Sequence, residues 1–229
     1  MKVVDLNLSG NVGKTTIATF LLSPRLKCPV VSVESINAEG TEDEVLRGKQ
    51  FADLMDRVTI ADAIVIDVGA SNIESFLEQM KAYRGSHDDF DAFVIPTVPK
   101  QKQIRDTMAT ASMLRNIGVP ARKIRVVMNM VELGEDPEHL FKPLFEAAAR
   151  GELRVHRDAV IHASEAYGKL RAANLSMEDV LSDPIDLKAA LKEAKTEEDK
   201  IRVSRAIGLR RLVDGVAEEL DMAFDALFS

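Results

Sequence analysis

A run near the amino terminus has the residue types and spacing of a phosphate-binding loop. It reads Gly10-Asn11-Val12-Gly13-Lys14-Thr15-Thr16, directly after a short apolar run. Glycines let the backbone approach a phosphate closely, and loop amides with a following helix N-terminus donate to phosphate oxygens. The lysine would neutralise the terminal phosphates, and the Thr15 hydroxyl would bind Mg²⁺. A general phosphate loop has glycine where this chain has Leu8, so an ordinary strand-to-helix turn is the alternative.

A carboxylate at the end of a second apolar run supports this interpretation. Asp67 lies in residues 63–68, the clearest buried strand in the sequence. An unpaired carboxylate there would be costly, and a role in holding Mg²⁺ explains it. A solvated aspartate at the strand end is the alternative. The turn at residues 69–71 is then expected beside the γ-phosphate.

The elements that must position these residues alternate along the chain. Short apolar or β-branched runs predict strands at residues 2–8, 29–33, 63–68, 92–98 and 124–130, and a last short strand at 159–160. Helices are predicted at residues 14–22, ending near Pro24, and at 42–56, 72–83, 101–117 and 137–150. This alternation indicates an α/β fold with a doubly wound, mostly parallel sheet.

The remainder of the sequence predicts helix from Ser164 onward. The last helix carries apolar residues at three- and four-residue steps: Leu209, Leu212, Val213, Val216, Leu220, Phe224 and Leu227. Such a stripe predicts one buried helix face. We expect a single nucleotide-binding domain over residues 1–229, with residues 163–229 as a helical C-terminal segment packed on it.

Composition narrows the class of protein. The chain has 229 residues, of which 46% are hydrophobic and 29% charged, which excludes disorder as the main state. Cys28 is the only cysteine, so no disulfide can form within the chain. No apolar run of about 18 residues predicts a membrane span, and we expect a cytoplasmic protein.

The motifs together resemble the ParA/MinD class of deviant Walker ATPases, whose loop reads Lys-Gly-Gly-x-Gly-Lys-Thr-Thr. Residues 6–16 and 33–37 are most similar to a group of plasmid stability proteins, and the class resemblance covers about residues 2–170. It implies a P-loop NTPase that binds ATP and Mg²⁺, dimerises around the nucleotide and hydrolyses ATP slowly. It also implies a small DNA-binding adaptor as partner, and a role in plasmid stability, segregation or conjugative transfer.

The resemblance also implies roles for single residues. Asn129 matches the residue that contacts adenine, with a strand-end turn as the alternative, and the Asn-Lys-x-Asp motif of GTPases is absent at this position. Ser9 replaces the lysine that reaches the partner's nucleotide. Glu34 is the acidic candidate for catalysis, with Glu39 as its alternative, and Ile36 stands where a second carboxylate is expected. A non-hydrolysing scaffold that senses ATP is therefore an alternative, and a small-molecule phosphotransferase is a third.

Two basic segments lie inside a chain whose net charge is −7. The segment from Lys100 to Arg125 holds seven basic residues and one acid, and the segment from Lys200 to Arg211 holds five basic residues and no acid. Such segments can bind DNA phosphates without sequence selectivity. Solvated helix faces and ion pairs across the chain are the alternative.

Overall fold

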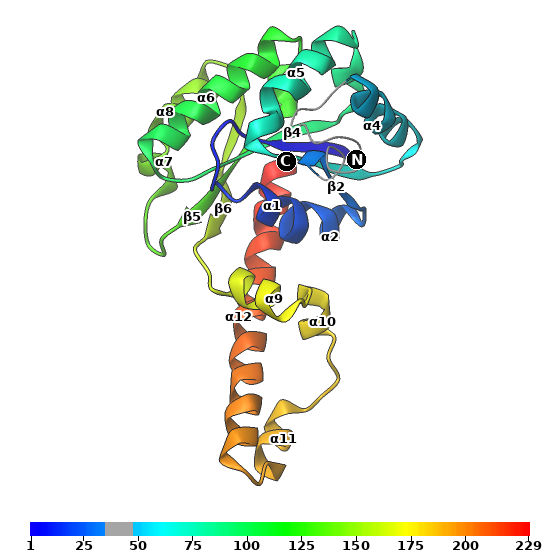
Figure 1. Cartoon of the computed structure of the whole chain (residues 1–229). Coiled ribbons are helices and arrows are strands. Elements are labelled where there is room, and N and C mark those ends of the chain that lie inside the picture. The colour runs from blue at the N-terminus through cyan, green and yellow to red at the C-terminus, as the bar shows by residue number, and fades with distance from the viewer. Residues whose placement is uncertain (35–47) are drawn as a thin grey trace. The chain divides into compact units, whose positions relative to one another are not determined.

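A computed structural model describes residues 1–34 and 48–229, which divide into two compact units (Figure 1). The first unit comprises Met1–His162 with Met222–Ser229, and the second comprises Ala163–Asp221. The expectation of a single domain stays a prediction.

A six-stranded sheet forms the centre of the first unit. Its strand order is β2-β3-β1-β4-β5-β6, and every pairing is parallel. The strands are β1 (Lys2–Leu6), β2 (Val30–Ser32), β3 (Ile64–Val68), β4 (Ala92–Thr97), β5 (Ile124–Val131) and β6 (Arg154–His162). Strands β3 and β4 are buried at every residue, as expected of a parallel sheet covered on both faces. The doubly wound prediction is confirmed, although β6 is longer than predicted.

Helices cover both faces of this sheet (Figure 1). One face carries α4 (Gly48–Ile60), α5 (Ile73–Ala82), α6 (Gln101–Asn116), α7 (Pro137–Leu140) and α8 (Lys142–Ala149). The other carries α1 (Lys14–Thr16), a π-helical turn (Ile17–Leu22), α2 (Ser23–Leu26) and the C-terminal end of α12 (Glu197–Phe228). The described residues of this unit also form short 3₁₀ helices at Ala70–Asn72, Ser86–Asp89 and Ala121–Lys123.

Two predicted helices differ in detail from the structure. The first helical region does not end near Pro24 but runs on to Leu26, because the proline lies in the first turn of α2, where its missing N–H is tolerated. The helix predicted at residues 137–150 is instead two helices, α7 and α8, separated at Phe141. The first residues of the helix predicted at 42–56 lie outside the described part of the chain.

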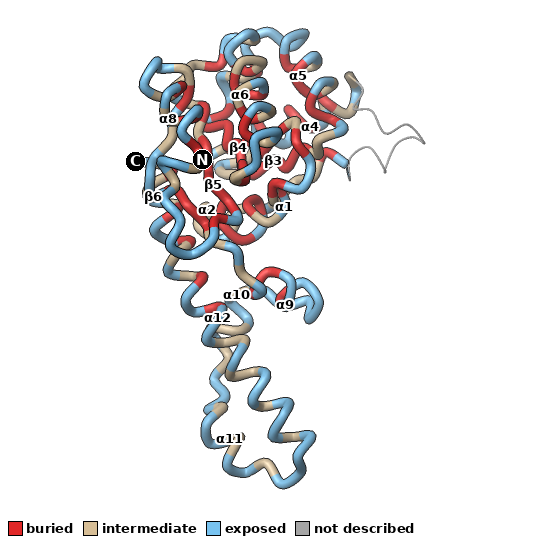
Figure 2. Tube along the Cα trace, turned by 90° about the vertical axis from the view of Figure 1, so that its left-hand side faces the viewer, coloured by how far each residue is buried: buried red, intermediate tan, exposed pale blue. Residues whose placement is uncertain are grey.

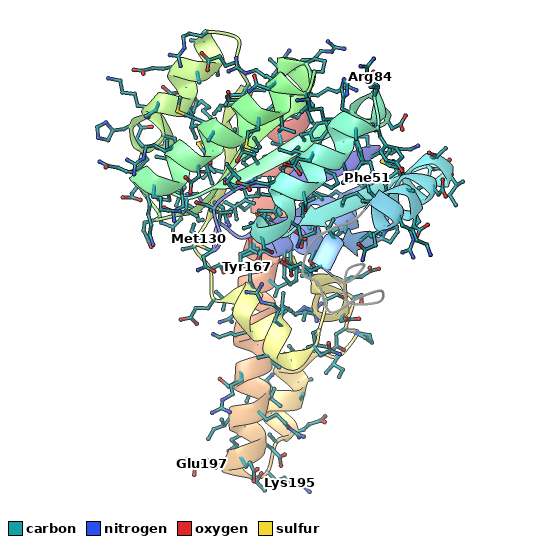
Figure 3. The ribbon with its side chains drawn as sticks, turned by 45° about the horizontal axis from the view of Figure 1, so that its top comes forward. Phe51, Arg84, Met130, Tyr167, Lys195 and Glu197 are labelled. Atoms are coloured by element: carbon teal, nitrogen blue, oxygen red, sulfur yellow. The ribbon has the colours of Figure 1, made fainter. Side chains whose placement is uncertain are left out.

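The main hydrophobic core lies between the sheet and the helices α4 to α8. Phe51, labelled in Figure 3, packs edge-on against Phe76 with 5.7 Å between ring centroids. Phe90 and Phe93 form a second edge-on pair at the same distance, 5.7 Å. All four rings are fully buried. Because large aromatic rings bury much apolar surface, these pairs contribute strongly to the packing of the helices on the sheet.

The second unit is helical, which confirms the prediction for the residues after Ser164. It contains α9 (Ala166–Ala173), α10 (Met177–Leu181), α11 (Leu187–Glu193) and most of α12. Neither α10 nor α11 has a buried residue, and Figure 2 shows how little of these helices is covered. The predicted stripe on α12 is wrong at Leu212, which is 38% exposed. None of the described helices is long and apolar enough to cross a membrane.

Because Phe93 is fully buried in this core, we expect that removing its ring destabilises the protein strongly. Phe93→Ala should lower the free energy of unfolding by about 3–5 kcal/mol, because it removes a fully buried ring and leaves a cavity. The measurement is urea unfolding followed by circular dichroism. Leu133→Ala is the control, because Leu133 is 83% exposed. Equal stability losses in the two variants would contradict the packing described here.

Candidate phosphate-binding site

The loop after β1 has a backbone conformation that its residue types explain. Asn11 has a φ of 57° and Gly13 a φ of 90°, both in the left-handed region. A Cβ atom on Gly13 would lie 2.2 Å from Nδ2 of Asn129, so that only glycine fits. Gly13 is also the N-cap of α1. The loop therefore makes a sharp turn and leads directly into the first turn of α1.

A cavity of about 380 Å³ lies over this loop, at the carboxyl ends of β1, β2 and β3. Its lining comes from three segments: Gly10, Asn11, Gly13, Lys14, Thr15 and Thr16; Ser32 and Glu34; and Asp67, Gly69, Ala70 and Ser71. The structure thus brings the predicted residues Lys14, Thr15, Asp67 and Glu34 to one cavity. The side chain of Val12, also predicted, is buried beside it in the core.

Thr15 and Asp67 form the part of the cavity suited to a metal ion. The Thr15 hydroxyl donates to Oδ2 of Asp67 at 2.8 Å. Burial raises the pKa of Asp67, and the hydrogen bond from Thr15 opposes that shift. The described residues contain no cluster of three or more His, Cys, Asp or Glu that could hold a metal alone. Mg²⁺ usually takes one or two protein oxygens together with phosphate oxygens and water, so this pair fits it.

Lys14 lies folded against the loop in this structure. Its Nζ donates to the carbonyl oxygens of Ser9 at 2.9 Å and Asn7 at 3.2 Å. Burial lowers the pKa of Lys14, while the nearby carboxylates of Asp5, Asp67 and Glu34 raise it. An ammonium group has three donors, so one remains for a phosphate oxygen.

Ser9 is an internal contact between the loop and α6. It is 1% exposed, and its hydroxyl donates to Oδ2 of Asp106. The same carboxylate oxygen accepts from Lys102 Nζ at 2.9 Å. The hydrogen bonds from Ser9 and Lys102 lower the pKa of Asp106. Ser9 therefore anchors the loop and supplies no positive charge.

Glu34 approaches the cavity from the other side. It is exposed, and a Cβ atom on Gly69 would lie 1.9 Å from its Oε1. A larger residue at position 69 would therefore displace the Glu34 carboxylate from this position. Ile36 and Glu39 lie outside the described residues.

Asn129 ties β5 to the loop. It is 3% exposed, and its Nδ2 donates to the backbone oxygen of Val12 at 2.9 Å. Met130 follows it with a φ of 56° and is 45% exposed (Figure 3). The amide nitrogen of Asn129 thus holds the loop in place. Its contact with adenine stays a prediction.

Asp5 is a buried acid that the sequence analysis did not single out. It lies in β1, in register with Asp67 of β3, and is fully buried. Neither carboxyl oxygen has a hydrogen-bond partner of normal geometry. Burial holds its pKa well above 3.8, and the charge of Asp67 adds to the shift, whereas Lys14 and the Ala18 amide oppose it. An aspartate within the apolar run Val3-Val4-Asp5-Leu6 was the available signal.

The first basic segment is largely engaged within the first unit. Lys102 pairs with Asp106 at 2.9 Å, and Arg115 with Glu152 at 3.7 Å. Lys123 Nζ donates to the Asp88 carbonyl at 3.2 Å. Arg125 donates to the Leu227 carbonyl at 2.5 Å and stacks over the Phe228 ring at 5.4 Å. Its binding of DNA stays a prediction.

Because Asn129 contacts the loop, we expect that removing its side chain weakens phosphate binding and leaves the preference between ATP and GTP unchanged. Asn129→Ala removes a buried hydrogen bond to the loop and should weaken binding of ATP, GTP and inorganic tripolyphosphate by about tenfold each. Isothermal titration calorimetry measures the three affinities. Asn116→Ala, at an exposed position on α6, should change none of them. A loss confined to ATP would show that Asn129 reads adenine and does not act through the loop.

Asp5 predicts a pH dependence of stability. Because its pKa is higher in the folded protein than the usual 3.8, the folded chain retains a proton that the unfolded chain releases. Stability should therefore fall as pH rises from about 4 through the raised pKa. Asp5→Asn should make the free energy of unfolding less dependent on pH above about pH 4.

The control for this experiment is Asp89→Asn, which removes an exposed carboxylate. Urea unfolding at a series of pH values gives the slope for each variant. An unchanged slope in Asp5→Asn would contradict the raised pKa.

Comparison with known proteins finds solved structures of similar fold, all of low sequence identity. No protein-family model matches the chain, and no curated protein matches its sequence. A ParA family ATPase from Chlorobium tepidum TLS has a TM-score of 0.54 at 14% identity, covering 90% of this chain and 97% of that one. MinD in the MinC:MinD complex of Aquifex aeolicus is similar to the chain with a TM-score of 0.52 at 13% identity, covering 93% and 96%.

A third solved structure, a plasmid partition protein of Borrelia burgdorferi B31 bound to AMPPNP, has a TM-score of 0.50 at 13% identity. It covers 91% of this chain and 97% of its own. At these identities the likeness concerns the fold. Together with the parallel sheet and the loop after β1, it shows that the chain has the fold of ParA/MinD-type P-loop ATPases.

Proposed function

We propose that this protein binds ATP with Mg²⁺ and acts as a nucleotide-dependent dimerisation switch. One observation carries the proposal: the Thr15–Asp67 pair, Lys14 and the glycine-containing loop before them line the same cavity. A phosphate group needs converging amides, a cation and oxygen ligands for its metal ion. The cavity offers all three.

Each residue then has a defined task. The loop from Gly10 to Thr16 cradles the phosphates, and Lys14 turns one donor toward the terminal phosphate. Thr15 and Asp67 hold Mg²⁺, which neutralises phosphate charge when bound. Glu34 lies where it can orient a water molecule, because its carboxylate is beside the turn at Gly69. Asn129 fixes the loop and, by the family resemblance, lies near the adenine.

The proposed role is in plasmid stability, segregation or conjugative transfer, as in the plasmid stability protein StbB. Residues 6–16 and 33–37 support this resemblance. The partner proposed is a small DNA-binding adaptor of the StbA type on plasmid DNA, with nonspecific DNA contact through the two basic segments. The protein would act in the cytoplasm.

A non-hydrolysing scaffold that senses ATP is a second candidate. It is favoured by Ser9, whose hydroxyl is committed to Asp106 and brings no cation to a neighbouring nucleotide. A missing transition-state cation can cost about 10³-fold or more in hydrolysis rate. The two candidates share ATP binding and differ in turnover.

The test measures ATP affinity, ATP turnover and oligomeric state with and without plasmid DNA. Lys14→Ala should lower affinity or turnover by about 10²–10³-fold, because it removes the cation at the terminal phosphate. Lys81→Ala, at an exposed position on α5, is the matched control. A wild-type protein that binds no ATP and stays monomeric overturns the proposal, and tight binding without turnover favours the scaffold.

A further inference from the structure

Two threonines of α6 are fully buried beside the segment that leads into the loop. Thr107 and Thr110 are both 0% exposed. Each hydroxyl donates to the helix carbonyl four residues earlier, that of Thr107 to Gln103 at 2.8 Å and that of Thr110 to Asp106 at 2.7 Å. Such a bond satisfies the hydroxyl proton inside a helix. Because a hydroxyl oxygen also has lone pairs, each threonine can still accept a hydrogen bond from another segment.

Both threonines accept from the residues just before the loop. Nδ2 of Asn7 donates to Oγ1 of Thr107 at 2.9 Å, and the backbone amide of Leu8 donates to Oγ1 of Thr110 at 3.2 Å. Residues three apart lie on the same face of a helix, so one face of α6 meets both donors. The same helix also binds the Ser9 hydroxyl through a carboxylate. α6 therefore contacts three successive residues of the chain.

Asn7 has no spare donor with which to replace the bond to Thr107. Its Nδ2 also donates to the Pro96 carbonyl at 2.7 Å, and its Oδ1 accepts from the Ser9 amide at 2.9 Å. A side-chain amide has two N–H donors, and these two acceptors use both. Asn7 is 0% exposed, so loss of the Thr107 oxygen would leave a buried N–H without a partner, which is costly.

The backbone of this segment holds the Lys14 side chain. The carbonyl oxygens that accept from Lys14 Nζ, at 3.2 Å and 2.9 Å, belong to Asn7 and Ser9. Lys14 is 9% exposed and lines the cavity. The position of its ammonium group therefore depends on where α6 holds residues 7–9.

We propose that Thr107 and Thr110 are positioning residues for Lys14. Their hydroxyl oxygens fix residues 7 and 8 and thereby the carbonyls that hold the ammonium group at the cavity. Their importance for phosphate binding rests on the proposed function, in which Lys14 meets the terminal phosphate. The hold on Lys14 itself needs no bound nucleotide, so it can be tested separately.

Removal of a hydroxyl tests the hold on Lys14 without any ligand. Thr107→Val keeps a branched side chain but loses the acceptor, so Lys14 should become more accessible and react with trace acetic anhydride about tenfold faster. Peptide mass spectrometry of the labelled full-length protein measures the rate. Thr107→Ser, which retains the hydroxyl, should stay within about twofold of the wild-type rate. Thr110→Val is the second variant and should also speed the reaction.

Thr59→Val is the matched control. The Thr59 hydroxyl also donates to the helix carbonyl four residues earlier, that of Met55 at 2.8 Å, but it lies at an exposed position on α4. This variant should leave the acetylation rate of Lys14 unchanged. Urea unfolding gives the stability of each variant. A loss of stability in both α6 valine variants without a change at Lys14 would assign the threonines to packing alone.

Inorganic tripolyphosphate gives the second readout. Thr107→Val and Thr110→Val should each weaken its binding by about tenfold, because they displace the cation that meets phosphate. Thr107→Ser and Thr59→Val should change the affinity by less than about twofold. Isothermal titration calorimetry on the full-length protein measures these affinities.

The two readouts separate the positioning role from the proposed function. A wild-type protein that binds no tripolyphosphate, together with faster acetylation of Lys14 in Thr107→Val, contradicts the proposed function and supports the positioning role. A wild-type acetylation rate in both α6 valine variants overturns the positioning role, whether or not tripolyphosphate binds. A Thr107→Ser variant that reacts as fast as Thr107→Val also overturns it, because the hydroxyl would then have no part in holding Lys14.

Discussion

The parallel pairing of β1 with β3 is the constraint on which the site depends. Register places Asp5 opposite Asp67 and directs the loop after β1 beside the turn after β3. Thr15 can then donate to Asp67 across 52 residues of sequence. Because the two strands end at the same edge, the loop after β1 and the Asp67 carboxylate lie side by side.

The loop is held from three directions by segments distant in sequence. Asp106 of α6 accepts from Ser9, Asn129 of β5 donates to Val12, and Lys14 donates back to the loop's own carbonyls. A loop that is already held in position loses less entropy when a ligand binds to it. The burial of Lys14, Asp67 and Asp5 adds an electrostatic consequence. Desolvation favours the neutral form of each side chain, so it raises the pKa of Asp5 and Asp67 and lowers that of Lys14. A bound phosphate and metal ion would supply the missing counter-charges.

The second unit differs from the first in having little hydrophobic core. Its helices bury few side chains, and neither α10 nor α11 has a buried residue. A helical segment with little core of its own gains stability from packing against another surface.

The sequence alone determined the strand–helix alternation, the glycine-containing turn from Gly10 to Thr16 after the first strand, and the place of Asp67 in a buried strand, because local patterns encode these features. It did not reveal that Asp5 is fully buried, that Ser9 binds Asp106, or that Asn129 donates to Val12. Those depend on which segments lie side by side. It also placed Leu212 in the buried stripe, since periodicity shows that a helix has a face but not which residues at its margin are covered. Only the tertiary structure decides such contacts, because they join residues about a hundred positions apart.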